Sequence, residues 1–580
     1  MERRDGAVVD RYGQVMVLRS GLSSGGVGNP PSMASAAPPQ VDGAAPVNER
    51  GALVHPSEDG TAASSEEGAS SRRRHALITL VIAACAAGAA VAINRWLFPL
   101  YSANRDDHIY VAMAKVLRHG HVTLAADEWP FRPWATGLVD GHIVFKYAPP
   151  WPSVLALGDI LGSTLVGLGL SAAAAVVAVR ALALEVVRDR TTALVATVLL
   201  VCSPVFLVQS GTYLPYLFSL TLGAASSALL LNGVRTASAV RLGLGGAVAG
   251  VALFARPFDA ALLLVPVVIA VLVTSRRTGS VRANALAMAA GVAPLLALDL
   301  AYNWLVLGSP FKLPFSVTGS ADAFGFGHRG VFESSTLPFD FGDGLSGAGV
   351  SLQWLPSWLA GGPVLVALGV WGLIALLREA PRPARWAVAS WIVIVPVAYV
   401  FFWGPWAMTH NWDGVQMFGP FYHLPIVVPA VVFGAHGLRM LAARSWSATG
   451  IILAVMVAFT VWSLPDKIDL NQETTDQYRA VQRAVDRADL HDAILFLPLR
   501  GDGGFLSITP FLEYDPGLDA PVLYAEDCGT SANLAVLDDH PGRDGYRLEL
   551  VDDERPTDAD SYAVVSISDD APTRRVDCPK

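Results

Sequence analysis

Long apolar stretches alternate with short polar segments along most of this chain. Eleven of these stretches approach the ~20 residues that a helix needs to cross about 30 Å of hydrocarbon. They cover residues 75–98, 158–180, 191–209, 214–234, 241–255, 258–275, 283–307, 358–377, 386–403, 421–438 and 446–464. Residues 191–234 contain no charged side chain, and the Ser203-Pro204 pair and residues 209–215 mark a bend between two helices. The pattern therefore predicts a polytopic α-helical membrane protein with about eleven transmembrane helices.

The two ends of the chain have a different pattern. Residues 1–74 are rich in Gly, Ala, Ser and Pro, which predicts a disordered region because such a segment cannot bury a core. Residues 465–580 combine helical spacing at 474–488 with three short apolar runs typical of buried strands. These runs are 493–497, 521–525 and 562–567. We expect three parts: a disordered region (1–74), a transmembrane domain (75–464) and a small α/β domain (465–580).

The charges agree with this division. Only 16% of the residues are charged, whereas soluble domains average about 25%. Residues 466–580 hold 25 Asp and Glu against 11 Lys and Arg, so the net charge of −9 hides an acidic tail and a basic remainder. No basic patch is interleaved with aromatic residues, which argues against a nucleic-acid partner.

The basic residues also predict an orientation. Arg72, Arg73 and Arg74 stand directly before the first span, and arginines recur in every second loop after it. Because cytoplasmic loops are enriched in Lys and Arg, the N-terminus is expected in the cytoplasm. An odd number of spans then places the tail domain outside the cytoplasm, together with the long loops 99–157, 308–357 and 403–420.

The first of these outer loops contains an acidic pair, Asp106-Asp107. The residues that follow have an apolar stripe at helical spacing, so the pair is expected at a helix N-terminus. Three interpretations remain open: helix capping, binding of a divalent metal ion, and a general base. Capping accounts for one aspartate better than for two.

Two cations near the outer face could bind a phosphate. Lys146-Tyr147 precedes the second span, where aromatic residues often mark the membrane interface. Arg256 separates two short spans, and either a phosphate or the nearby Asp259 could be its partner. Both interpretations of Arg256 remain open.

Other candidates are scattered over the outer loops. His328 and Arg329 end the Gly-rich segment 324–330, and Tyr422 belongs to Gly419-Pro-Phe-Tyr422. His410, Asp413 and His423 are too dispersed to favour a metal site over structural roles. No Walker or Gly-x-Ser-x-Gly pattern is present, so ATP-driven transport and serine hydrolysis lose support.

Four cysteines occur in the chain. Cys85 and Cys202 lie in apolar spans, where free cysteines are common packing residues. Cys528 and Cys578 lie in the tail domain, and an exported domain permits a disulfide between them.

Taken in order along the chain, these motifs resemble those of the GT-C superfamily of integral-membrane glycosyltransferases. The resemblance covers roughly residues 75–465. It is carried by Asp106-Asp107, Lys146-Tyr147-Ala-Pro-Pro, Arg256-Pro257, Tyr302-Asn303 with Gly308-Ser309-Pro310, and Gly419-Pro-Phe-Tyr422. The acidic pair looks most like the arabinofuranosyltransferase type, beside protein O-mannosyltransferases and aminoarabinose transferases. Phe421-Tyr422 departs from the Arg-Tyr that the superfamily has near the penultimate span.

The resemblance implies an inverting hexosyl- or pentosyltransferase at the outer face of the cell membrane. Its donor would be a polyprenyl-phosphate-linked sugar and its acceptor a glycan, lipid or protein of the cell envelope. Asp106 or Asp107 would be the base, Asp107 being slightly favoured because it adjoins the predicted helix. Lys146, Arg256 and Arg329 would lie near the phosphate, and Tyr147, His328 and Tyr422 are further substrate-binding candidates. A transporter or flippase, and a non-catalytic envelope-assembly protein, are the alternatives.

Overall fold

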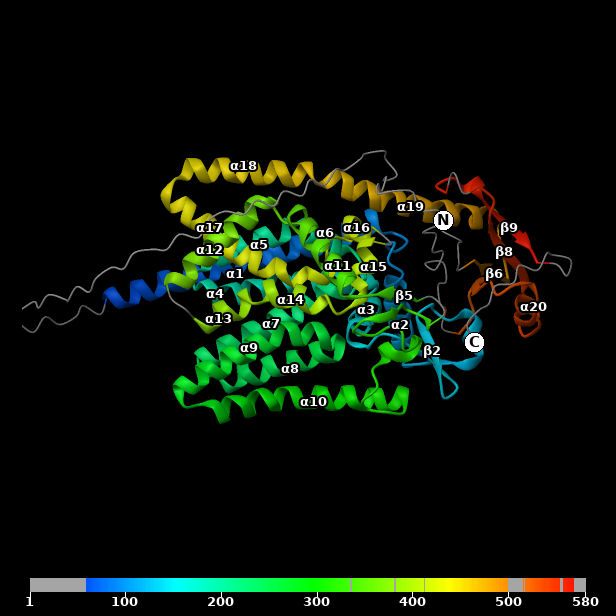
Figure 1. Cartoon of the computed structure of the whole chain (residues 1–580), viewed down its shortest axis with the longest axis horizontal. Coiled ribbons are helices and arrows are strands. Elements are labelled where there is room, and N and C mark those ends of the chain that lie inside the picture. The colour runs from blue at the N-terminus through cyan, green and yellow to red at the C-terminus, as the bar shows by residue number, and fades with distance from the viewer. Residues whose placement is uncertain are drawn as a thin grey trace, which may run out of the picture. The chain divides into compact units, whose positions relative to one another are not determined.

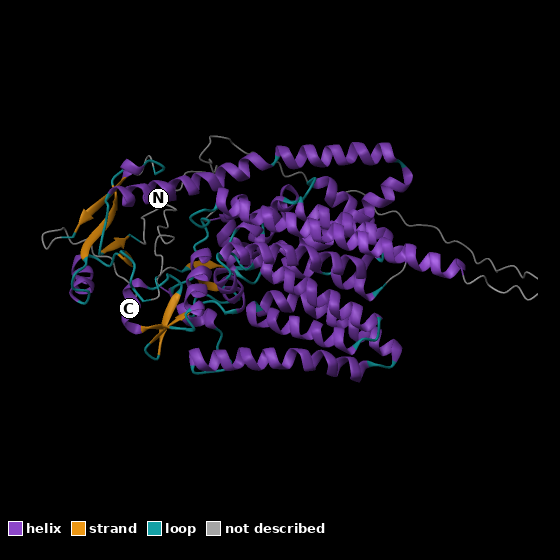
Figure 2. Ribbon diagram, turned by 180° about the vertical axis from the view of Figure 1, so that it is seen from behind, coloured by secondary structure: helices purple, strands orange, loops and turns teal. Residues whose placement is uncertain are grey.

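The computed structural model describes residues 59–333, 336–379, 382–410, 413–498, 515, 517–552 and 556–567, with side chains from Ser70 onward. Its main part is a bundle of apolar helices (Figure 1, Figure 2). They are α1 (Asp59–Leu97), α4 (Thr164–Val187), α5 (Arg190–Val201), α6 (Pro204–Gly211), α7 (Tyr216–Arg235), α8 (Ala239–Ala255), α9 (Pro257–Thr278), α10 (Val281–Leu307), α12 (Pro363–Glu379), α13 (Pro383–Ala389), α14 (Trp391–Tyr399), α17 (Val427–Arg444) and α18 (Trp446–Trp462).

Seven of the described helices are long and apolar enough to cross a membrane, or up to nine if each of two bent helix pairs counts as one span. One pair, α5 and α6, bends by 62° at Pro204, where proline has no N–H to continue the helix. The predicted spans 241–255 and 386–403 correspond to the two shorter apolar helices, Ala239–Ala255 and Pro383–Tyr399. The class of a polytopic helical membrane protein is confirmed, whereas the count of eleven spans stays a prediction.

The first helix is longer than expected. It begins at Asp59, before the predicted start of the first span at residue 75. A helix already nucleated by a strongly apolar segment extends at little cost through Ala, Glu, Ser and Arg residues. Residues 1–58 lie outside the described residues.

Close packing of small residues brings α8 against α10. A methyl group on Gly291 of α10 would lie 1.9 Å from the carbonyl oxygen of Gly243 in α8. Such small-residue contacts are common between membrane helices because they let the backbones approach. Arg256 follows the last residue of α8 and precedes α9, so this packing fixes its place at one end of the bundle.

The first long loop folds at that same end (Figure 1). Its elements are α2 (Asp106–Arg118), β1 (Leu124–Ala125), the 3-10 helix η1 (Ala126–Phe131), β2 (Thr136–Val139), β3 (His142–Phe145) and α3 (Pro150–Ile160). The strands form an antiparallel sheet in the order β1-β3-β2. Pro150 occupies the first turn of α3, where a proline is tolerated because that turn leaves its N–H groups unpaired.

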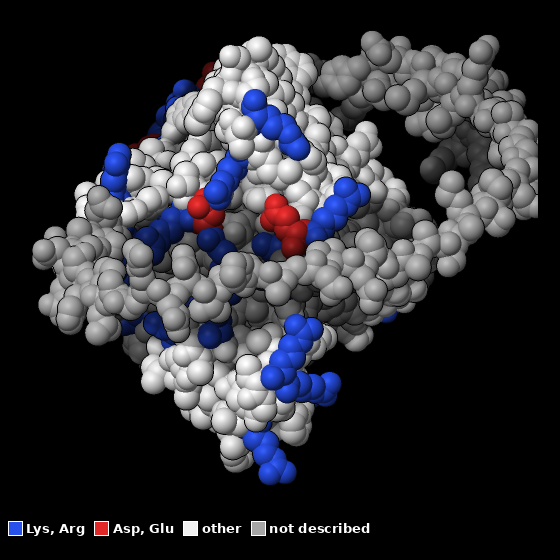
Figure 3. Space-filling view, turned by 90° about the vertical axis from the view of Figure 1, so that its left-hand side faces the viewer, with Lys and Arg blue, Asp and Glu red and all other residues white. Residues whose placement is uncertain are grey.

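The later loops add α11 (Phe341–Trp354), α15 (Trp403–His410), α16 (Gly414–Phe418), the 3-10 helix η5 (Phe421–Ile426) and a hairpin of β4 (Gly327–Arg329) and β5 (Leu337–Phe339). We call the end of the bundle that carries α2 and these loops the Asp106 end. The opposite end, where Arg188, Arg235, Arg382 and Arg439 lie, is the arginine-rich end. Figure 3 shows that Lys and Arg outnumber Asp and Glu on the visible face of that end.

The C-terminal part is an α/β unit, as predicted. Helix α19 (Leu464–Arg487) leads to a four-stranded sheet of β7 (Val522–Glu526), β6 (Ala493–Leu497), β8 (Asp544–Leu550) and β9 (Tyr562–Ser566), in that order, with α20 (Thr530–Asp538) after β7. Neighbours β7, β6 and β8 are parallel and β9 is antiparallel. Strand β8 was not predicted, since only one of its side chains is fully buried and its sequence has no apolar run.

Alternate residues of β6 face two different partners, as the pleat of a strand requires. Leu495 and Leu497 pack with Tyr478 of α19. Ile494 and Phe496 pack with Phe131 of the first loop. The tail sheet therefore shares its core with both α19 and the loop that carries α2.

Candidate active site

Asp106 and Asp107 occupy the first turn of α2, as predicted, yet neither caps the helix. The side chain of Asn104 accepts a hydrogen bond from the backbone N–H of Asp106 at 3.1 Å. The capping interpretation of the acidic pair is therefore wrong, because neither carboxylate makes a capping hydrogen bond to the first turn of α2.

Asp107 points into the protein. It has no exposed surface and accepts a hydrogen bond from the backbone N–H of Ser102 at 3.1 Å. Burial raises the pKa of the Asp107 carboxyl to about 7, although the bonds from Ser102 oppose the rise. Its position anchors the segment before α2 to the helix.

Asp106 has different neighbours and remains partly exposed. It accepts a hydrogen bond from the hydroxyl of Tyr147 and lies close enough to Lys146 to interact electrostatically. Burial raises the pKa of the Asp106 carboxyl, while the Lys146 charge and the Tyr147 hydroxyl oppose that rise. A raised pKa makes an ionised carboxylate a better proton acceptor.

Lys146 forms a buried ion pair that was not predicted. Its ammonium lies 2.5 Å from one carboxylate oxygen of Asp322, and the indole N–H of Trp403 donates to the other oxygen at 2.9 Å. The side chains of Lys146 and Asp322 are 4% and 1% exposed. Lys146, Asp322 and Trp403 come from three separate loops, so these interactions connect the loops. The only sequence signal for the ion pair was that Asp322 is a lone acid in a long uncharged stretch.

Arg256 is bonded to Asp259, which was one of its two partners suggested by the sequence. Its Nε donates to Asp259, which also accepts the hydroxyl of Tyr399. The guanidinium lies 4.3 Å from the ring centroid of Tyr216. The two terminal nitrogens have no protein acceptor among the described residues, so they can still bind an oxygen ligand.

Tyrosine rings surround these charges. Tyr110 of α2 stacks on Tyr147 with 4.6 Å between ring centroids. Tyr422 meets the ring of Tyr216 edge-on at 5.2 Å, and the two hydroxyls are hydrogen-bonded. Tyr216 contacts both Tyr422 and the guanidinium of Arg256, and so connects these two residues. Of the predicted candidates, the structure brings together Asp106, Lys146, Tyr147, Arg256 and Tyr422.

His328 and Arg329 lie apart from this cluster, on strand β4. His328 is exposed. The guanidinium of Arg329 donates to the carbonyl oxygens of its own loop, including that of Gly325 at 3.1 Å. Neither residue contacts Asp106, Lys146 or Arg256, and their role in substrate binding stays a prediction.

Metal binding by the acidic pair stays a prediction. The two carboxylates of the pair bond to different partners, Tyr147 and Ser102. Within the described ranges, no group of three or more His, Cys, Asp or Glu side chains converges to hold an ion.

Cys528 takes part in a disulfide, and Cys85 and Cys202 are free. Its predicted partner, Cys578, lies outside the described residues.

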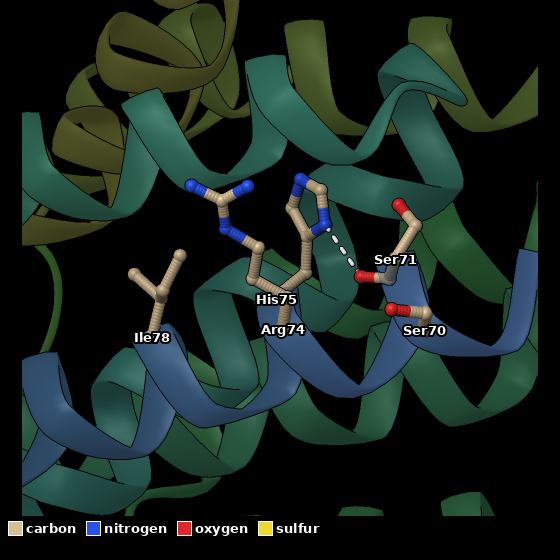
Figure 4. Close-up of a pocket in the computed structure, with 5 residues that line it drawn as sticks. All are labelled: Ser70, Ser71, Arg74, His75 and Ile78. Atoms are coloured by element: carbon tan, nitrogen blue, oxygen red, sulfur yellow. Dashed lines mark hydrogen bonds between the residues drawn. The ribbon is translucent and has the colours of Figure 1, made fainter. Parts of the chain in front are cut away.

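A separate pocket borders the start of α1, where Arg74 and His75 point to the same side (Figure 4). His75 bonds to the carbonyl oxygen of Ser71 at 2.8 Å, within its own helix. None of the predicted site residues lines this pocket.

Comparison with solved structures identifies a similar fold. ArnT from Cupriavidus metallidurans, bound to undecaprenyl phosphate, aligns with a TM-score of 0.54 and 13% identity over 84% of this chain and 98% of that protein. The apo form of the same protein aligns at 0.46, with 13% identity over 76% and 87%. The oligosaccharyltransferase AglB from Archaeoglobus fulgidus, in complex with an inhibitory peptide and dolichol-phosphate, aligns at 0.41, with 14% identity over 71% and 58%.

At sequence level, residues 493–565 match a family described as a domain of unknown function, DUF7846. No curated protein sequence matches the chain significantly. The alignment with ArnT shows that the chain shares the fold of that protein.

Proposed function

We propose that this protein is a glycosyltransferase that moves a sugar from a polyprenyl-phosphate-linked donor to an acceptor of the cell envelope. The observation that carries the proposal is the cluster around Asp106: a partly exposed carboxylate beside two cations, Lys146 and Arg256, within tyrosine rings. The GT-C fold supports it, since the similar ArnT structure holds undecaprenyl phosphate.

The reaction we propose is a single displacement with inversion at the anomeric carbon. A hydroxyl oxygen of the acceptor forms a bond to that carbon, and its proton passes to the Asp106 carboxylate. The bond between the anomeric carbon and the phosphate oxygen breaks, and the polyprenyl phosphate leaves with the electron pair. General-base assistance of this kind contributes typically about 10²–10⁴-fold to a rate.

Arg256 is the first candidate for binding the leaving phosphate. Its Nε is used by Asp259, which fixes the guanidinium, and its terminal N–H groups face no protein acceptor among the described residues. Arginine presents such N–H pairs in a geometry that matches phosphate oxygens. Lys146 contributes charge from its fixed place beside Asp322. Fixed donors near a developing charge need no rearrangement during the reaction.

Asp106 is a better candidate for the base than Asp107, which the sequence had slightly favoured. Asp107 is fully buried and bonded to Ser102, so an acceptor hydroxyl has no access to it. Asp106 is partly exposed and shares its neighbourhood with both cations.

We also propose that the Asp106 end faces away from the cytoplasm. Arginines gather at the opposite end, which matches the enrichment of basic residues on the cytoplasmic side. A reporter that is active only in the cytoplasm, fused after Lys580, should then be silent. A strong signal would reverse this orientation.

The function is tested by the lipids of a deletion strain. If the protein consumes a polyprenyl-phosphate sugar, that lipid should accumulate in the deletion strain and be identified by mass spectrometry of lipid extracts. The wild-type gene should restore the normal level, and an Asp106→Asn gene should not. A lipid profile that the deletion leaves unchanged would refute the proposed donor class.

A further inference from the structure

Arg105, directly before Asp106, is a cation without a carboxylate partner. Its guanidinium makes no hydrogen bond or ion pair within the described structure. Its guanidinium lies 5.7 Å from the ring centroid of Trp134, and it interacts electrostatically with Tyr478 and Asp106. Burial lowers the pKa of Arg105, so this charge is held partly away from water.

Three other cations at this end each have a carboxylate partner. Lys146 bonds to Asp322 and Arg256 to Asp259. Arg132, also in the first loop, lies 3.0 Å from Glu526 of β7. Withdrawing a charge from water is costly unless an opposite charge or hydrogen bonds replace the solvent. Arg105 therefore lacks a partner that its neighbours have.

Arg105 is nevertheless held in place. The indole N–H of Trp134 donates to the carbonyl oxygen of Arg105 at 3.2 Å. Phe332 packs edge-on against Trp134 with 5.7 Å between ring centroids. Tyr478 belongs to α19, so the tail also contributes to the surroundings of this arginine. A fixed cation is prepared to bind an anion without further ordering.

The contacts of Arg105 differ from those of the donor-side cations. Arg105 meets Trp134 and Tyr478, whereas Arg256 meets Tyr216 and Asp259. In an in-line displacement, the attacking hydroxyl approaches the anomeric carbon from the side opposite the leaving phosphate. If Arg256 binds the phosphate of the donor, Arg105 remains as a cation next to Asp106 that has different contacts. It is therefore available to bind the acceptor.

We propose that Arg105 binds a phosphate or carboxylate group of the acceptor, near the hydroxyl that receives the sugar. This inference rests on the proposed function and names the chemical class of the acceptor. Guanidinium groups bind both anions through paired N–H donors. Trp134 positions Arg105, and α19 completes the subsite from the tail.

The test uses the full-length purified protein and the polyprenyl-phosphate sugar that accumulates in the deletion strain. Envelope glycans and lipids of that strain are separated by anion exchange into neutral and anionic fractions. We expect wild-type protein to transfer sugar to the anionic fraction only. Inorganic phosphate should raise the apparent KM of this acceptor.

Variants of Arg105 then locate the interaction. Arg105→Gln should raise the acceptor KM at least tenfold, and Arg105→Lys should raise it less. Binding of undecaprenyl phosphate should change by less than twofold in both variants, which also shows that they are folded. Arg118→Gln, at the far end of α2, is the matched control, since Arg118 is half-exposed and pairs with Asp159.

Each contrary result has a definite meaning. Equal transfer by the wild type to neutral acceptors, or an unchanged acceptor KM in Arg105→Gln, would refute the anionic acceptor while leaving the glycosyltransferase proposal intact. Loss of undecaprenyl phosphate binding in a folded Arg105→Lys variant would show that Arg105 binds the donor, which would refute its proposed role in acceptor binding. Absence of transfer to either fraction by the wild type would refute the proposed function and this inference together.

Discussion

Two ion pairs, one at each end of the helix bundle, differ strongly in their exposure. At the arginine-rich end, the Arg439–Asp189 pair has side chains 55% and 29% exposed, and Asp189 also caps α5. At the Asp106 end, the Lys146–Asp322 pair is 4% and 1% exposed and joins different loops. Exposed pairs of the first kind contribute little free energy, whereas a buried pair persists only with good partners. The difference indicates that the Lys146–Asp322 pair holds different loops of the Asp106 end together.

The largest expected effect comes from breaking the buried pair. Asp322→Ala leaves the Lys146 ammonium buried without its partner, which should lower the free energy of unfolding by about 3–5 kcal/mol. Thermal unfolding of the purified protein measures this. Lys146→Met combined with Asp322→Leu removes both charges and should recover most of the stability. Equal losses in the single and double variants would show that packing dominates over charge.

The second effect is a pH dependence from Asp107. Its pKa is about 7 in the folded protein, above the ordinary value of an aspartate. The folded state therefore binds the extra proton between about pH 4 and 7, and stability is lost as pH rises through this window. A shift of this size corresponds to about 4 kcal/mol. In the Asp107→Asn variant, the melting temperature should decline less between pH 5 and 8 than in the wild type. An equal decline in both proteins would show that other groups cause the pH dependence.

The third effect separates the two interpretations of Arg256. Arg256→Gln alone leaves the Asp259 carboxylate without its cation. The informative variant is therefore the double variant Arg256→Gln/Asp259→Asn, in which both charges are removed. If Arg256 binds the donor phosphate, the double variant should fold normally and bind undecaprenyl phosphate at least tenfold more weakly, as isothermal titration or native mass spectrometry would measure. Normal binding in the double variant would leave Arg256 only the task of neutralising Asp259.

The smallest effect is expected at the arginine-rich end. Asp189→Asn keeps an oxygen that can cap α5 and removes the ion pair with Arg439. The free energy of unfolding should fall by less than about 1 kcal/mol. A loss as large as that in Asp322→Ala would erase the contrast between the two ends.

Sequence patterns were sufficient for the elements whose signal is local. The apolar stretches located the membrane helices, and the stripe after Asp106 located α2. They did not reveal Asp322 as the partner of Lys146, because these residues are 176 positions apart and meet only through the fold. Nor did they separate Asp106 from Asp107, since adjacent residues of a helix point in different directions and only the surroundings decide which one is accessible.

The most direct test of the account compares Asp106→Asn with Asp107→Asn in single-turnover transfer from the polyprenyl-phosphate sugar. Asparagine keeps the size of the side chain and removes its basicity. We expect Asp106→Asn to lose about 10²–10⁴-fold in rate while still binding undecaprenyl phosphate. Asp107→Asn should retain a rate near that of the wild type at neutral pH. Full activity of Asp106→Asn, or a larger loss in a folded Asp107→Asn variant, would contradict the assignment of Asp106 as the base.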